Sequence, residues 1–230
     1  IAISEAIRLA VNELDGRIPV KVIPSAGSAL PVQIGNVERL RTSFGGEFVA
    51  GHVGALDDST KGQLQIIDLA RRWQSVRPGV RFVLVGSGRD ETRLRSAAAG
   101  LDNVIFTGQV DNVGDYLAAF DLFLFPSRHE GLGSILLDAL EAGLPVVATA
   151  VGGIPEIIRD GENGTLVRTD DAAALEQAVD AFRSSEPLRA RVSAANRARA
   201  AEFSAAAMTA RYDRLYRTLA SSHNLRLLLP

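Results

Sequence analysis

The sequence contains no cysteine among its 230 residues, and several other features are scarce. Without thiols the chain can form neither a disulfide nor a thiolate metal site, and a cysteine nucleophile is excluded. Aromatic residues make up 6% of the chain and the net charge is −2, so the composition predicts no nucleic-acid partner. No Asp-x-Asp pair occurs, which argues against a site that holds phosphates through a divalent metal ion.

Long apolar runs are also missing, and none has the length that a bilayer span requires. The chain begins with Ile1 rather than Met, and its opening lacks the layout of a signal peptide. We therefore expect a fragment or processed product of a soluble, cytoplasmic protein. Its 47% hydrophobic residues suffice for a substantial core in one large or two small domains.

Short apolar runs alternate with amphipathic stretches through the middle of the chain. The apolar runs predict strands at 48–53, 80–85, 104–106, 122–125, 146–148 and 165–167. Helical spacing predicts helices at 3–14, 62–76, 91–99, 113–119, 134–142, 154–159 and 172–182. Residues 187–219 are also mostly helical, with a break near Phe203 and Ser204, whereas 21–24 predicts a strand and 25–38 a loop. The alternation predicts an α/β fold with a doubly wound, parallel, Rossmann-like sheet.

Loops that contain glycine or polar residues follow the predicted strands. They lie at 54–61, 86–88, 108–110, 127–133 and 151–153. Because ligands of doubly wound sheets bind beyond the carboxyl ends of the strands, we expect these loops to converge on a single site.

The stretch 123–148 predicts a strand, a loop, a helix and a second strand. Gly131 and Gly133 allow close approach of a ligand, and the free N–H groups of a helix beginning near Ser134 predict an anion site. Two acids, Glu130 and Asp138, flank this site. Because a carboxylate repels phosphate, we predict that both acids hold hydroxyl groups. A ligand with phosphates between two sugars, a sugar nucleotide, fits this arrangement.

The pattern Pro126-Ser127-x-x-Glu130-Gly131-x-Gly133, followed by an acid eight residues after Glu130, resembles the E-x7-E signature of retaining GT-B glycosyltransferases of the group 4 family. The second acid is Asp138, where the family usually has Glu. The side chain of Asp is shorter than that of Glu by one carbon–carbon bond of about 1.5 Å. Further similar stretches are Val85-Gly86-Ser87-Gly88, Phe106-Thr107-Gly108-Gln109-Val110 and Gly152-Gly153-Ile154-Pro155-Glu156-Ile157-Ile158.

The resemblance, which covers residues 20–205, implies the C-terminal, donor-binding half of a GT-B fold with C-terminal helices. Residues 1–19 would be the last helix of an N-terminal acceptor domain, 20–205 the nucleotide-sugar-binding domain, and 206–230 a C-terminal helix and tail. Catalytic roles are implied for Glu130 at the donor sugar and for Lys61 at the diphosphate. The chain uses Lys only at Lys21 and Lys61. The family often has an Arg upstream of this Lys, but Ala55 stands there.

The resemblance also implies a set of nucleotide-sugar contacts, with the nucleobase at Gln109 and Val110 and the ribose at Asp138. The full set is Gly86, Gly88, Gln109, Val110, Gly131, Leu132, Gly133, Ser134, Ile135 and Asp138. We expect neither a cofactor nor a metal. The implied reaction moves a hexose from a nucleotide donor, most often UDP-linked, to a glycan or lipid acceptor with retention of configuration. The acceptor would be bound by the missing N-terminal domain.

Several alternatives stay open at this stage. One alternative is that Lys61 and Asp138 are ordinary solvated side chains. Another is that segments 108–110 and 152–158 are turns with a structural role and no ligand. The chain can also belong to a GT-B sugar-nucleotide epimerase or be a non-catalytic nucleotide-sugar-binding module. We predict that His129 is a surface residue. An excess of arginine near the C-terminus predicts either a solvated helical face or contact with an anionic lipid at the cytoplasmic face of a membrane. These residues are Arg183, Arg189, Arg191, Arg197, Arg199, Arg211, Arg214 and Arg217.

Overall fold

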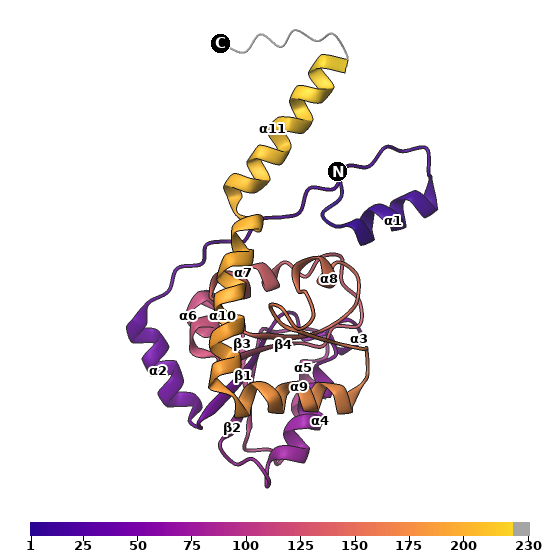
Figure 1. Cartoon of the computed structure of the whole chain (residues 1–230). Helices are drawn as coiled ribbons and strands as arrows, with labels where there is room; N and C mark the ends of the chain where they lie inside the picture. The colour runs from indigo at the N-terminus through magenta and orange to yellow at the C-terminus, as the bar shows by residue number, and fades with distance from the viewer. Residues whose placement is uncertain (223–230) are drawn as a thin grey trace.

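Six parallel strands form one sheet in the computed structural model, which describes residues 1–222 (Figure 1). The strands are β1 (Phe48–Val53), β2 (Val80–Val85), β3 (Val104–Gly108), β4 (Leu122–Phe125), β5 (Val146–Thr149) and β6 (Thr165–Val167). Their spatial order is β3-β2-β1-β4-β5-β6, so the direction of winding reverses between β1 and β4. The predicted doubly wound, Rossmann-like α/β fold is confirmed, and the carboxyl ends at this switch point are where such folds bind ligands.

Helices cover both faces of the sheet, as the continuous burial of β1, β4 and β5 requires. Successive strand residues point to opposite faces. In β1, Val49 and Val53 therefore join one hydrophobic cluster while Phe48 and Ala50 join the other. The first cluster includes α6 (Val113–Ala119), α7 (Ile135–Glu141) and α8 (Ile154–Ile157), and the second includes α4 (Gln63–Trp73), α5 (Glu91–Ala97) and α9 (Ala172–Ser184).

Helix α2 (Ile34–Phe44) lies partly where a loop was predicted over 25–38. That prediction was wrong because Gly35 falls in the first turn, where a glycine does not interrupt the helix. The apolar stripe of α2 packs against α6. In addition, the buried carboxylate of Asp115 accepts the N–H of Gln33, at 2.6 Å, just before the helix begins. Hydrogen bonds from Gln33 and the neighbouring Asn side chains lower the pKa of Asp115.

Two further predictions need correction. The strand expected at 21–24 is only an isolated bridge between Ala2 and Val22, because β-strand pairing partners for the rest of this segment are not found within residues 1–222. The helix expected at 62–76 is observed as α4, but it ends earlier than predicted, at Trp73. The one-turn helix α3 (Asp58–Lys61) precedes it within the loop predicted at 54–61, and Gly62 separates the two helices at a left-handed φ of 69°.

The C-terminal segment consists of α10 (Glu186–Ala200), a short 3-10 turn (Ala201–Phe203) and α11 (Ala205–Ser222). The predicted break is confirmed, since Ser204 is extended and Phe203 is buried. Helix α11 extends away from the sheet, and α1 (Glu5–Leu14) lies to one side of it (Figure 1). The tail predicted within 206–230 lies, from His223 onward, outside the described residues. Within residues 1–222, no helix combines the length and apolar character that crossing a bilayer requires.

Candidate functional site

The loops that follow β1 to β5 meet at the carboxyl edge of the sheet, as the sequence predicted. Hydrogen bonds join each loop to its neighbour. They run from Gly86 N–H to Gly108 O (2.9 Å), from Leu56 N–H to Ser87 O (3.0 Å), from Arg128 N–H to Thr60 O (2.7 Å) and from the Thr149 hydroxyl to Ser127 O. The five loops therefore form one continuous surface.

Lys61 and Glu130, the two predicted catalytic residues, form an ion pair on this surface. Their side chains are 20% and 10% exposed, so the pair is largely shielded from solvent. The Ser127 hydroxyl donates to the same Glu130 oxygen at 3.1 Å. The Lys61 ammonium also lies over the ring of Phe125, 5.3 Å from its centre. The geometry thus brings a cation and an acid together. The ammonium can still donate a hydrogen bond to a ligand, and the carboxylate can still accept one.

The position of Lys61 differs from the predicted one. It was expected at the start of a helix, but it is the last residue of the one-turn helix α3. Gly62 then turns the chain so closely past the carbonyl of Pro126 that a side chain would have no room there. A lysine at the end of a helix is compatible with the helix dipole, whereas one at the start is opposed by it.

A cavity of about 280 Å³ opens between the loops after β1, β2 and β3. It is lined by Val53, Gly54, Ala55, Val85, Gly86, Ser87, Gln109, Val110 and Val113. Three predicted contacts, Gly86, Gln109 and Val110, are therefore brought together here. Gly88 does not line the cavity. A Cβ at Gly88 would lie 2.5–2.8 Å from backbone atoms of Leu56, so this glycine permits the two loops to pack.

The predicted anion site lies at the start of α7. The backbone N–H groups of Gly133, Ser134 and Ile135 have no hydrogen-bond partner within the described residues. Ser134 is exposed, whereas the side chain of Leu132 is buried in the core and leaves only its backbone for a ligand. The segment therefore offers donors and little else, which suits a group with several oxygen acceptors.

Asp138 does not line the cavity of Gln109 and Val110. Its Oδ1 accepts the N–H of Ser28 at 2.7 Å. Glu141, one turn further along α7, accepts the N–H of Ala29 at 3.0 Å. Asp138 is 9% exposed, so it is not the solvent-facing helix acid that the sequence left open. Its observed role is to hold the 26–33 loop, beside a second cavity of about 330 Å³. A ribose contact stays a prediction.

His52 and Gln63 were not assigned any role from the sequence, yet both are fully buried beneath the site. His52 Nδ1 lies 2.9 Å from the carbonyl of Leu124, so this nitrogen carries the proton. The other nitrogen then accepts from Gln63 Nε2 at 3.3 Å, and Gln63 Nε2 also donates to Ala55 O at 2.7 Å. Burial lowers the pKa of His52 to about 4, so the ring is neutral near pH 7.

This chain of bonds fixes the end of β4 against the loop after β1. The only sequence signal was a polar pair within buried segments, which periodicity alone cannot distinguish from a solvated pair.

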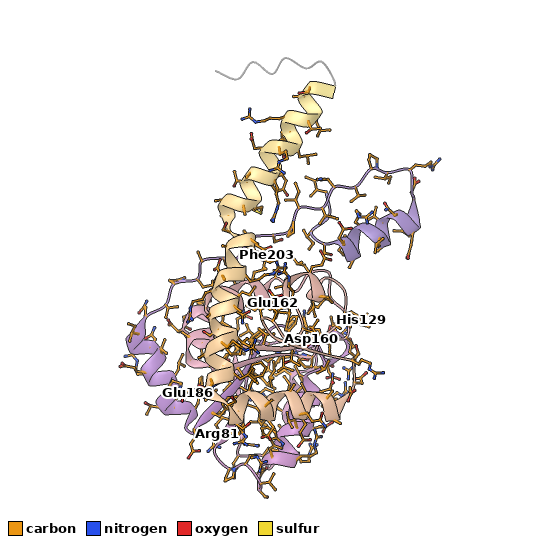
Figure 2. The ribbon with its side chains drawn as sticks, viewed as in Figure 1. Arg81, His129, Asp160, Glu162, Glu186 and Phe203 are labelled. Carbon is orange, nitrogen blue, oxygen red and sulfur yellow. The ribbon has the colours of Figure 1, made fainter. Side chains whose placement is uncertain are left out.

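Other predicted groups have ordinary positions. His129 is exposed and lies at the periphery of the molecule, as predicted (Figure 2).

No group of three or more His, Cys, Asp or Glu side chains within residues 1–222 is arranged to hold a metal ion.

Several of the C-terminal arginines are bound within the chain. Arg199, for example, donates to the carbonyls of Glu156 and Ile157, and Arg183 pairs with Asp180. Contact with an anionic lipid stays a prediction.

Residues 47–184 match the family of glycosyl transferases group 1. A phosphatidyl-myo-inositol mannosyltransferase of Mycobacterium leprae is 31% identical over 228 residues, which cover 94% of this chain and 60% of that protein. The structure of Anabaena HepE in complex with UDP and glucose has a TM-score of 0.83 at 26% identity and covers 96% of this chain and 62% of that one.

A further solved structure is the C-terminal domain of the glycosyl transferase group 1 family protein LpcC from Francisella tularensis. It has a TM-score of 0.65 at 25% identity and covers 74% of this chain and 92% of that one. The chain thus spans about 60% of the length of the mannosyltransferase and of HepE, but nearly all of this isolated domain.

Proposed function

Because the chain belongs to the glycosyl transferases group 1 family, we propose that it is the C-terminal, donor-binding half of a retaining GT-B glycosyltransferase of the group 4 type. The whole enzyme transfers a hexose from a nucleotide-diphosphate sugar, UDP-linked, to a glycan or lipid acceptor, and this chain supplies the donor-binding half. The relatives are named as glycosyltransferases, which favours transfer over the epimerase reaction. HepE was solved with UDP and glucose, which supports the choice of UDP as the first donor to test.

The observation that carries the proposal is the Lys61–Glu130 pair, whose acid precedes by a few residues the N–H groups at the start of α7, which have no partner within residues 1–222. In the proposed reaction the bond between the sugar and the diphosphate breaks, and negative charge develops on the leaving diphosphate. The Lys61 ammonium and the N–H groups of Ser134 and Ile135 stabilise this charge. Glu130 accepts hydrogen bonds from hydroxyl groups of the sugar and so orients it.

Protein groups neutralise the phosphates in this proposal, so binding needs no divalent metal. Affinity for the donor is modest in this chain because no facing domain closes over the site to exclude water. We expect a dissociation constant on the order of 100 µM.

The chain by itself transfers nothing, because retaining transfer needs the acceptor aligned with the donor at near-attack distance. The groups that bind the acceptor belong to the N-terminal half of a GT-B enzyme. The helices α1 and α11, which lie to the side of the sheet and extend away from it, are suited to contact that half (Figure 1).

The test is calorimetric titration of UDP-glucose, GDP-mannose and ADP-glucose into the chain, with and without EDTA, followed by an assay for glycosyl transfer. We expect one donor to bind equally well in both buffers, with no transfer. Absence of binding by all three contradicts the donor site, and binding abolished by EDTA contradicts its metal-free character. Transfer by the chain alone contradicts the assignment as half of an enzyme.

A further inference from the structure

Helix α1 is attached to the site by its first turn. No residue of the helix itself is buried, but Ser4, which caps it, is fully buried. The Ser4 hydroxyl accepts the N–H of Ile7 at 3.1 Å and donates to the carbonyl of Gly131 at 2.6 Å. One hydroxyl therefore begins the helix and holds the backbone of the residue that follows Glu130.

The carboxylate of Glu156 holds the same turn from α8. It accepts the N–H groups of Glu5 at 2.9 Å and of Ala6 at 3.3 Å, which are first-turn donors that the helix cannot satisfy itself. The negative charge also lies at the positive end of the helix dipole. Ser4 and Glu156 are 152 residues apart in sequence, so the attachment of α1 depends on the assembled fold.

The turn at Gly152 and Gly153 supports the segment from another direction. Gly152 lies against the carbonyl of Glu130, with no room for a side chain. A Cβ at Gly153 would lie 2.6 Å from the carbonyl oxygen of Gly131 and 2.9 Å from the Cβ of Ser4. The Glu130–Gly131 peptide is thus enclosed between this turn and the first turn of α1.

We propose that Ser4 and Glu156 are positioning residues for the sugar-binding segment at Glu130 and Gly131. Ser4 acts through its bond to the Gly131 carbonyl, and Glu156 acts by keeping the first turn of α1, with Ser4, in place. Together they hold Glu130 where its carboxylate meets both Lys61 and a bound sugar. The sugar as ligand rests on the proposed function, whereas the positioning of the segment does not.

The variants Ser4→Ala and Glu156→Gln test this proposal, with Glu162→Gln as the matched control. Glu162 is an exposed acid of the same region, and its side chain pairs, among residues 1–222, with Arg159 alone (Figure 2). In calorimetry we expect affinity for UDP-glucose to fall about twofold to tenfold in both variants, the size of one ordinary hydrogen bond, with UDP affinity unchanged. Glu162→Gln should change neither affinity. Equal losses for UDP and UDP-glucose, or no loss, overturn the proposal.

Amide hydrogen exchange without ligand tests whether Ser4 and Glu156 position the segment at Glu130 and Gly131, even if no donor binds. The N–H groups of Leu136 and Leu137 donate to the carbonyls of Gly133 and Ser134 and report on the order of the segment. We expect faster exchange at these two amides in Ser4→Ala and Glu156→Gln, together with faster exchange in the first turn of α1. Acceleration confined to α1 would show that the two residues hold the helix alone. Failure of wild-type protein to bind UDP-glucose contradicts the proposed function, not the positioning.

Discussion

The ammonium of Lys61 and the carboxylate of Glu130 are paired although 69 residues separate them in the sequence. The pair has a direct consequence for binding. A diphosphate that approaches Lys61 must share the ammonium with Glu130, so the acid weakens phosphate binding while it serves the sugar. The two halves of the ligand can therefore be separated by substitution.

Lys61→Ala should weaken binding of UDP by about one to two orders of magnitude, the usual contribution of a charged hydrogen bond. Binding of uridine should change little, since the nucleoside has no phosphate. Calorimetry with both ligands measures the difference. Equal losses for UDP and uridine would remove Lys61 from the phosphate site.

Glu130→Gln should have opposite effects on the two ligands. The neutral amide no longer competes for Lys61, so affinity for UDP should rise severalfold. The advantage of UDP-glucose over UDP should disappear, because an amide oxygen accepts hydroxyl hydrogen bonds more weakly than a carboxylate. Asp170→Asn, at an exposed acid that pairs with Arg128, is the control and should leave both affinities unchanged. Weaker UDP binding in Glu130→Gln would contradict the competition.

Much of the sheet could be predicted because the strands are short and mostly apolar, and the strands β1, β4 and β5 are buried throughout. The predicted limits of β1, β2, β4 and β6 equal the observed ones. Helix α2 was missed because Gly35 and Pro31 indicate a loop locally, while the contacts that stabilise the helix come from α6 and Asp115. Interactions of this kind are set by tertiary packing and leave no local pattern.

The sequence predicted which residues belong to the site, but it did not predict which residues of the chain they bind. The spacing around Glu130 indicated its loop, yet nothing local indicated that Lys61 would be its partner. Asp138 was assigned to a ligand, whereas the structure shows that it also binds the Ser28 N–H. A carboxylate has two oxygens, and a sequence pattern does not say which one is already occupied.

Asp138→Asn tests whether the second oxygen holds the ribose. The amide oxygen still accepts the Ser28 N–H, so the loop should stay in place. If Oδ2 accepts ribose hydroxyls, affinity for UDP should fall about tenfold and that for 2′-deoxy-UDP much less. Glu141→Gln, at the neighbouring loop-binding acid, should change neither. Comparable losses for both nucleotides would leave Asp138 with its structural role alone.

Ala55→Arg should strengthen diphosphate binding. Ala55 is exposed and lines the cavity beside Gly86, at the place where the family often has Arg. An added guanidinium supplies a second cation next to Lys61, and UDP affinity should rise about tenfold without change for uridine. The gain should shrink as salt is added. Ala55→Gln, which adds length without charge, should show no such gain, and an equal gain for uridine would contradict the charge effect.

The burial of His52 predicts that the stability of the fold depends on pH. Burial is the main cause that lowers the pKa of His52 from 6.5 to about 4, and the nearby Lys61 charge acts in the same direction. Between these values the unfolded chain binds the proton and the folded chain does not. The contribution of His52 to stability is therefore fully present above pH 6.5 and is lost as the pH falls to about 4. Protonation would also set two donors, His52 Nε2 and Gln63 Nε2, against each other.

His52→Gln tests this dependence, because its amide can donate to Leu124 O and accept from Gln63 without titrating. Urea unfolding from pH 7 to pH 4 measures the free energy of unfolding in both proteins. Wild-type protein should lose about 3 kcal/mol more than the variant over this range, since each pKa unit corresponds to about 1.4 kcal/mol. His129→Gln, at the exposed histidine, should follow the wild type. Parallel pH profiles of wild-type protein and His52→Gln would show that His52 is not held neutral by its burial.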